Sequence, residues 1–135
     1  MKKLNKKGFT LVELLAVIVV LALLMVVAAS SIGTALKNSK KSATKTEAQK
    51  IIRQLYQDNK SLSLTGSLTA ASAQEGTDGD TFTYKYDVAA TGAINNFCLK
   101  HSDGYWVTGT IDENGKETIA DPVEDKPADN SNCVD

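Results

Sequence analysis

The residue nearest the N-terminus that could do chemistry is a carboxylate inside an apolar run. From Phe9 to Ala29 the sequence is FTLVELLAVIVVLALLMVVAA, in which only Thr10 and Glu13 are not apolar. A carboxylate in lipid costs on the order of a few kcal/mol, so it ordinarily has a partner or a role. If the chain were cut before Phe9, the new α-amine would lie at a similar depth and could offset the Glu13 carboxylate of an adjacent helix. The alternative is that Glu13 reaches water at the membrane surface and has no specific partner.

The second set of reactive residues lies toward the C-terminus. Cys98 and Cys133 are the only cysteines, and an even number favours a disulfide in a secreted chain but not in a cytosolic one. The bond would tie the C-terminal tail back to the domain and add roughly 3 to 4 kcal/mol at the upper end. Two unpaired thiols are the alternative. Cys98 and His101 are also candidate metal ligands, but without a second pair they make a weak zinc site.

No catalytic constellation is visible in the sequence. There is one histidine, and we find no nucleophile elbow, phosphate-cradling glycine loop or acidic pair in a diagnostic context. We therefore predict a protein that is not an enzyme and that uses no cofactor and no metal.

The apolar run must be placed by an element of its own. It is long enough for a helix that crosses a bilayer, since a hydrocarbon core of about 30 Å needs about 20 residues. A secretory signal cut between Ser30 and Ser31 is the alternative, but its apolar region is typically about 7 to 15 residues long. Lysines on both sides of the run leave its orientation undecided.

Residues 6–15, KKGFTLVELL, followed by the unbroken apolar run, resemble the class III signal of type IV pilins and the related pseudopilins. The resemblance covers about the first thirty residues. It implies that a membrane prepilin peptidase cuts after Gly8 on the cytoplasmic side and methylates the new N-terminal Phe9. It also implies that Glu13, the fifth mature residue, neutralises the amine of a neighbouring subunit during assembly.

The same resemblance implies a life cycle and a set of partners. The precursor would be a single-pass protein of the cell membrane, and an inner-membrane assembly platform would add it to an extracellular homopolymer of pilin subunits. The leading hypothesis is a type IV pilus subunit used in adhesion, motility or DNA uptake. The alternatives are a pseudopilin of a type II secretion or competence system, or a monomeric binding module that is membrane-tethered or secreted. Cleavage at Ser30-Ser31 would release the sheet domain and favour the binding module.

Residues 31–60 predict the second half of the helix. Ala48, Ile51, Ile52 and Leu55 follow the i, i+3, i+4, i+7 spacing of one apolar face. Apolar residues are scarce between Lys37 and Glu47, so we expect this part to be exposed before assembly or to pack only on other subunits. The basic helix makes nucleic acid a possible partner, but the cluster lacks interleaved aromatic residues and nucleic acid is not indicated.

Charge is segregated along the chain. Residues 31–60 hold seven basic and two acidic residues, whereas residues 61–135 hold four basic and thirteen acidic ones. Two interpretations are open: an acidic domain attracts the basic helix of a neighbouring subunit, or the charges keep the surface soluble.

Residues 61–135 predict a small β domain. Residues 61–81, rich in Ser, Thr, Ala and Gly, predict a surface loop. Strands are predicted at residues 82–88, 94–101, 105–111 and 118–119, and the tail at residues 121–135 is expected to be irregular. The predicted fold is α+β: a long N-terminal hydrophobic helix packed by its C-terminal half on an antiparallel sheet of three or four strands. The expected parts are a leader (1–8), a membrane and assembly half-helix (9–30), an amphipathic half-helix (31–60) and a globular β head (61–135).

Overall fold

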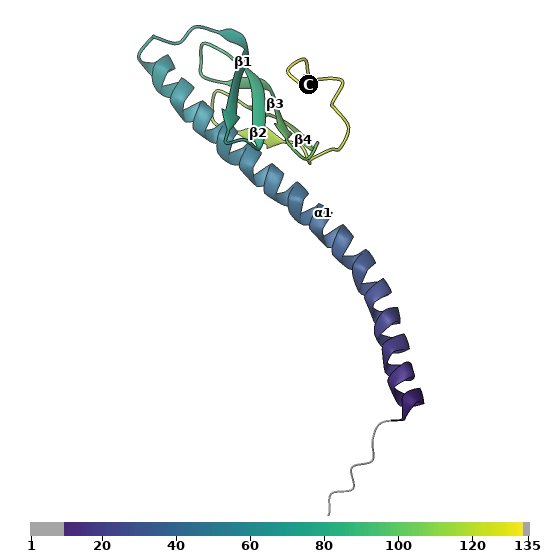
Figure 1. Ribbon diagram of the computed structural model, residues 1–135. Helices are drawn as coiled ribbons and strands as arrows, with labels where there is room; N and C mark the ends of the chain where they lie inside the picture. The colour runs from purple at the N-terminus through teal and green to yellow at the C-terminus, as the bar shows by residue number, and fades with distance from the viewer. Residues whose placement is uncertain (1–9, 134–135) are drawn as a thin grey trace, which may run out of the picture. The chain divides into compact units, whose positions relative to one another are not determined.

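The computed structural model describes residues 10–133 of the chain (Figure 1). The chain divides into two compact units, Met1–Asn38 and Ser39–Asp135. The helix α1 (Leu11–Leu64) begins in the first unit and ends in the second. Five strands follow it: β1 (Ala71–Asp78), β2 (Phe82–Val88), β3 (Ile94–His101), β4 (Trp106–Ile111) and β5 (Glu117–Ile119).

The five strands form one antiparallel sheet in the order β1-β2-β3-β4-β5, so each strand pairs with its neighbour in sequence. Short turns make these connections possible. The turn between β2 and β3 needs glycine, because Gly92 has φ +87° and a Cβ there would lie 3.0 Å from the Lys60 Cα of α1.

One face of the sheet packs on the Ser39–Leu64 part of α1 and forms the core of the second unit (Figure 1). Alternate strand residues point to this face, as the period of two requires. Phe97 and Leu99 of β3 are fully buried there, and so is Ile52 of the helical stripe. The remaining buried members of this core are Ala48, Ile51, Ile94, Val107 and Ile111.

The predicted α+β fold class is confirmed, including the helix packed by its C-terminal half on an antiparallel sheet. The predicted strands at residues 82–88 and 94–101 agree with β2 and β3. The two later strands differ only at their first residues. The described part of the tail, residues 121–133, is irregular as expected, and its strand pairing is limited to one β-bridge between Val123 and Trp106.

The expectation of a surface loop at residues 61–81 was wrong in two places. The helix continues to Leu64, where Gly66 at φ +70° closes it: the Ser67 N–H donates to the Leu62 carbonyl, and the Gly66 N–H donates to the Ser63 carbonyl. Beyond this cap, residues 71–78 form β1, a fifth strand.

The missed strand lies at the edge of the sheet, which explains why its sequence gave no alternation. An edge strand contacts only one neighbour, so its residues need not be apolar to be held in place. β1 has an irregular register at Ala73, a non-glycine residue with φ 51°. Its Glu75 is paired with Lys85 of β2 at 3.1 Å, which supplies an ionic contact in place of an apolar one.

Candidate assembly segment and disulfide-closed loop

The N-terminal part of α1 has an apolar surface that the described chain leaves uncovered. Its best 18-residue window has a mean hydropathy of 3.1, and none of that window is buried. The helix is therefore long and apolar enough to cross a membrane. The large exposed side chains here are Leu11, Val12, Leu14, Leu15, Val17, Ile18, Val19, Val20, Leu21, Leu23, Leu24, Met25, Val26 and Val27.

The first turn of α1 is closed by a pair of reciprocal hydrogen bonds. The Thr10 N–H donates to the Glu13 carboxylate at 2.9 Å, and the Glu13 N–H donates to the Thr10 hydroxyl at 3.3 Å. This is a capping box, which satisfies two amides that a helix N-terminus otherwise leaves unpaired. Glu13 therefore has a partner within its own chain. The sequence interpretation had considered only another chain or water.

The hydroxyls at the end of the apolar run are also paired locally. Ser30 and Ser31 both donate to the Val27 carbonyl, at 3.0 and 3.3 Å. This backbone pairing leaves no unsatisfied hydroxyl proton next to the apolar run. The helix passes without a break through Ser30-Ser31, the alternative cleavage site, and through Gly33.

The predicted processing residues fall in two groups. Gly8 and Phe9 lie outside the described residues. Glu13 lies in the first turn of α1 and is exposed. The pairing of Glu13 with the amine of another subunit involves a second chain and stays a prediction.

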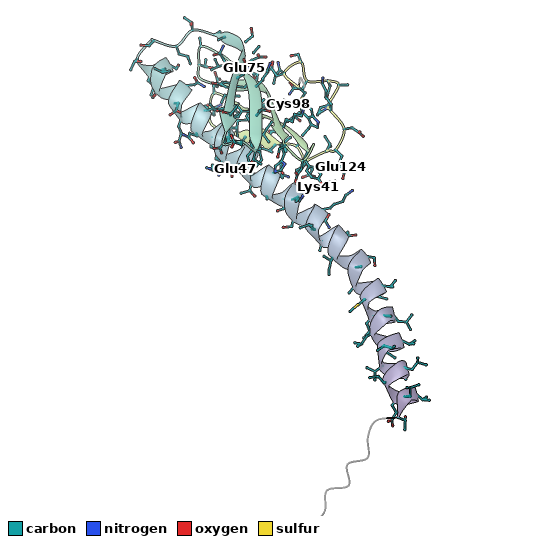
Figure 2. All side chains as sticks on the ribbon, viewed as in Figure 1. Lys41, Glu47, Glu75, Cys98 and Glu124 are labelled. Atoms are coloured by element: carbon teal, nitrogen blue, oxygen red, sulfur yellow. A yellow bond between two sulfur atoms is a disulfide. The ribbon has the colours of Figure 1, made fainter. Side chains whose placement is uncertain are left out.

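Lysines early in the second unit pair with acidic residues of the same head. The Lys40 ammonium donates to Asp103 at 2.7 Å, and the Lys45 ammonium donates to Asp121 at 2.5 Å. Lys41 lies 3.7 Å from Glu124 (Figure 2) and 5.8 Å from the centre of the Tyr105 ring. These hydrogen bonds hold the pKa of the Asp103 and Asp121 carboxyls below its usual value.

Further along α1, two more basic residues contact the sheet domain, one at strand β5 and the other at two of its turns. Arg53 donates through Nε and through a terminal nitrogen to the two Glu117 oxygens of β5, both at 2.5 Å. This hydrogen bonding lowers the pKa of the Glu117 carboxyl. The Lys60 ammonium donates to the backbone carbonyls of Thr91 and Glu113, at 3.3 and 3.0 Å.

The expectation that the helix between Lys37 and Glu47 is exposed is confirmed for most of its residues and wrong for a few. It was to be exposed, or packed only on other subunits, because it has few apolar residues. The exceptions are Thr44, which is buried and donates to the Lys40 carbonyl at 2.8 Å, and the lysines on either side of it, which reach acids of the same head. Ion pairs and a small residue hold this part, which apolar spacing does not predict.

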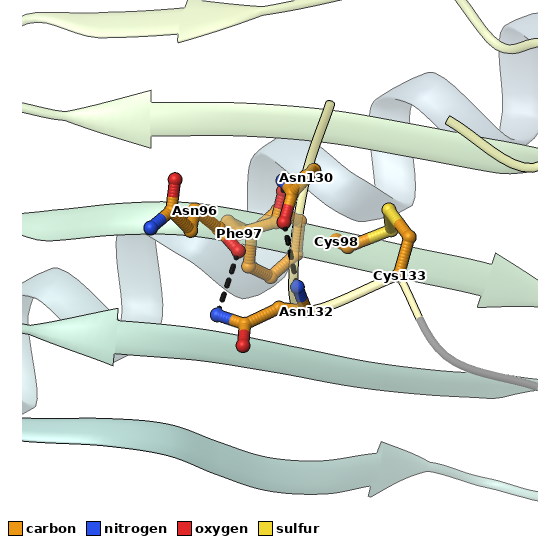
Figure 3. Close-up of a disulfide and its surroundings, with 6 residues drawn as sticks. All are labelled: Asn96, Phe97, Cys98, Asn130, Asn132 and Cys133. Atoms are coloured by element: carbon orange, nitrogen blue, oxygen red, sulfur yellow. Dashed lines mark hydrogen bonds between the residues drawn. A yellow bond between two sulfur atoms is a disulfide. The ribbon is translucent and has the colours of Figure 1, made fainter. Parts of the chain in front are cut away.

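On the opposite face of the sheet, Cys98 of β3 forms a disulfide with Cys133, and their Cα atoms are 5.3 Å apart. Both cysteines are buried with Trp106 in a small second cluster. Figure 3 shows the tail passing across β3 at this bond. Because the Cys98 sulfur is bonded, it is not a thiolate ligand, and His101 instead accepts a hydrogen bond from the Asp103 N–H at 2.8 Å.

An open hollow lies on this outer face beside the disulfide. Its volume is about 640 Å³, and its lining includes Thr83, Lys85, Cys98, Lys100 and Trp106. Lys100 lies over the Trp106 ring at 5.0 Å from its centre. Among the described residues, no group of three or more His, Cys, Asp or Glu side chains is placed to hold a metal ion.

The prokaryotic N-terminal methylation motif matches residues 3–29 of the chain. The match supports a class III signal of the type IV pilin and pseudopilin kind, so the resemblance stated from residues 6–15 is confirmed. It supports a pilin-like or pseudopilin precursor anchored in a membrane, and points to a structural protein. No curated protein and no solved structure matches the chain.

Proposed function

We propose that this chain is a structural subunit of a type IV pilus. The precursor is cut between Gly8 and Phe9, Phe9 is methylated, and the N-terminal half of α1 polymerises with copies of itself into an extracellular filament. The methylation motif and the uncovered apolar helix support this proposal together, since the motif implies processing and polymerisation.

The exposed apolar surface is the observation on which the proposal depends. A helix that is apolar all round is stable only in lipid or among other apolar helices, because exposing it to water costs about 25 cal/mol per Å². A membrane offers one such environment and a bundle of identical helices offers the other. The same segment therefore suits both an anchored precursor and an assembled filament.

Glu13 has a specific place in this function. The capping box gives its carboxylate a hydrogen bond but leaves its negative charge uncompensated. Cleavage before Phe9 creates a cation four residues away in sequence, at nearly the depth of the Glu13 of an adjacent helix. Charge pairing between subunits then favours the assembled state and fixes the axial register.

The test uses Glu13→Gln, because glutamine can also close a capping box but has no charge. We expect the variant to be processed and inserted but to yield at least about tenfold fewer sheared filaments, since an uncompensated intramembrane charge is worth more than the 1.4 kcal/mol of a tenfold change. Glu47→Gln, which removes a charge elsewhere on α1, is the control and is expected to assemble normally. Normal filament number with Glu13→Gln would refute the assembly role of this carboxylate.

The mature N-terminus provides a second test. Mass spectrometry of the N-terminal peptide from cells is expected to show methylated Phe9. A mature chain that begins at Ser31 would lack the polymerising helix and would overturn the proposal in favour of a released binding module. Electron microscopy with an antibody to the head separates a pilus from a pseudopilus, because a pilus subunit is expected along long surface fibres.

The hollow beside the disulfide favours a second candidate function for the head, the capture of a small ligand. Its volume of about 640 Å³ lies within the usual range for ligand sites of about 300 to 1,000 Å³. This candidate belongs to the binding-module interpretation. It requires a ligand that binds the full chain and is lost when Lys85 and Lys100 are replaced together by alanine.

A further inference from the structure

The middle of β3 contains a bulge that interrupts the sheet on both of its sides. Asn96 has φ 51°, and it is aligned with no residue of β2 or of β4. The register shifts between Lys85 and Asp87 on one side and between Ile94 and Phe97 on the other. The Asn96 carbonyl therefore needs a partner from outside the ladder.

The C-terminal tail supplies that partner through its asparagine side chains (Figure 3). The Asn132 side-chain amide donates to the Asn96 carbonyl at 3.0 Å. It also donates to the Asp87 carboxylate at 3.1 Å. The Asn130 side-chain amide donates to the Phe97 carbonyl at 3.1 Å. Asn132 is only 6% exposed, so its amide is shielded from water that would compete for these bonds.

Asp87 joins three segments at this point. Besides the Asn132 amide, its carboxylate accepts from the backbone N–H of Ala73 at 2.8 Å and from the side-chain amide of Asn96 at 2.7 Å. These donors come from β1, β3 and the tail. The tail therefore binds to strand residues, Asp87 and Asn96, that are already hydrogen-bonded to each other.

The tail is also ordered within itself before it reaches the cysteine. The Asn132 N–H donates to the Asn130 side-chain oxygen at 2.9 Å, and the Cys133 N–H donates to the Asn130 carbonyl at 3.1 Å. This turn places Cys133 directly after the docked Asn132, against Cys98, which lies two residues beyond Asn96. None of these contacts involves a sulfur atom, so all of them are open to the reduced chain.

We propose that Asn132, held by Asp87 and the Asn96 carbonyl, docks the tail on β3 before oxidation and so directs Cys133 to Cys98 of the same chain. Without this dock each cysteine would also react with a cysteine of another copy, and copies are concentrated in the plane of a membrane. The proposal rests on contacts within the head, and it does not depend on assembly into a filament.

The oxidation itself needs an external disulfide, such as oxidised glutathione or a thiol oxidoreductase. One cysteine thiolate attacks that disulfide and releases one thiol, and the second cysteine thiolate then displaces the other thiol. The chain loses two protons and two electrons, and the oxidant becomes two thiols. Docking accelerates the second step, because it raises the effective concentration of Cys133 near Cys98 above that of any cysteine from another molecule.

The test follows oxidation of the reduced full chain in detergent micelles by oxidised glutathione, with timed thiol alkylation and separation on non-reducing gels. We expect Asn132→Ala and Asp87→Ala to slow closure of the internal disulfide by about tenfold, the factor for loss of one or two hydrogen bonds, and to accumulate disulfide-linked dimers. Asn95→Ala is the matched control: Asn95 is an exposed β3 residue with no side-chain hydrogen bond among the described residues, and its variant is expected to close like the native chain.

A second measurement decides the matter even if a variant folds poorly. In Cys98→Ser/Cys133→Ser no disulfide can form, and we expect the backbone amides of residues 132 and 133 to remain protected from hydrogen exchange. That protection is expected to disappear when Asn132→Ala is added. Unprotected tail amides in the double-serine chain, or closure of the Asn132 and Asp87 variants at the native rate without dimers, would overturn the proposal.

Discussion

At the scale of single residues, the local environment of two carboxylates decides what each can do. Glu13 closes a capping box with Thr10, and the spacing of that box, threonine followed three residues later by glutamate, is legible in the sequence. The capping box was not predicted, because partners for an acid in a membrane segment were considered only in other chains or in water. The two roles are compatible, since a carboxylate has acceptor positions for both an amide and an amine.

The Asp87 carboxyl gives a prediction on pH. Its pKa lies below the ordinary 3.8, first because of the Ala73 amide and then because of Asn96, while burial acts in the opposite direction. A lowered folded-state pKa stabilises the head fully above the unfolded value and loses this contribution as the pH falls through the folded value. We therefore expect the free energy of unfolding to fall as the pH drops below about 4, and to fall less in Asp87→Asn.

The measurement is urea unfolding of the full chain in micelles, followed by Trp106 fluorescence at pH 7 and pH 3. Asp103, Glu117 and Asp121 act with the same sign, because their pKa values are also lowered, so Asp87→Asn is expected to reduce the acid effect rather than abolish it. A nuclear magnetic resonance titration that places the Asp87 carboxyl at or above 3.8 would contradict the prediction.

At the scale of elements, the spacing of apolar residues predicted the helix and the strands that are stabilised by apolar burial. The Ala48 to Leu55 stripe and the alternation in β2 identify the two sides of the core. Residues on one face of a helix recur every three or four positions, and residues on one face of a strand recur every two. β1 and the helical turn after Lys60 were missed because capping, edge pairing and an ion pair hold them. Such interactions leave no repeating pattern in a sequence.

The contact between α1 and β5 gives a prediction at this scale. Arg53 and Glu117 meet through two parallel hydrogen bonds, and the Glu117 side chain is 21% exposed. A fork of this kind is stronger than a point contact of charges. A double-mutant cycle with Arg53→Ala and Glu117→Ala is expected to give a favourable coupling energy, reduced by solvent screening because the Arg53 side chain is exposed.

Arg53→Lys is the informative control for this pair, because it keeps the charge and removes the fork. We expect it to lose most of the coupling energy in the same urea experiment. Equal stability of Arg53→Lys and the native chain would show that only net charge matters at this contact.

At the scale of the whole molecule, the disulfide is expected to make a large contribution to the stability of the head. It closes a sequence separation of 35 residues, for which chain entropy gives roughly 3 to 4 kcal/mol as an upper value. We expect Cys98→Ala/Cys133→Ala to lower the free energy of unfolding by up to about that amount. A loss well below about 1 kcal/mol would mean that residual structure in the unfolded, reduced chain already keeps the two cysteines close together.

The distribution of charge was visible in the sequence, but its use was not. A basic helix and an acidic domain were open to attraction between subunits or to simple solvation. In the structure, Lys40 and Asp103 pair across 63 residues of sequence, and Lys45 and Asp121 across 76. Which acid meets which base depends on where the turns of the sheet fall along the helix, and no pattern along the chain encodes that. The contacts of Asn130 and Asn132 with β2 and β3 likewise follow from the three-dimensional arrangement and leave no pattern in the sequence.

This internal pairing has a consequence for how copies of the protein would adhere to one another. Because these helical cations already pair with acids of their own subunit, they contribute less to attraction between subunits. Cohesion would then come mainly from the apolar N-terminal segment, including the proposed Glu13 pair within it. Dissolved ions screen charges but strengthen or leave unchanged the attraction between oily surfaces. We therefore expect filaments of this protein to be as resistant to dissociation at high salt concentration as at low salt concentration.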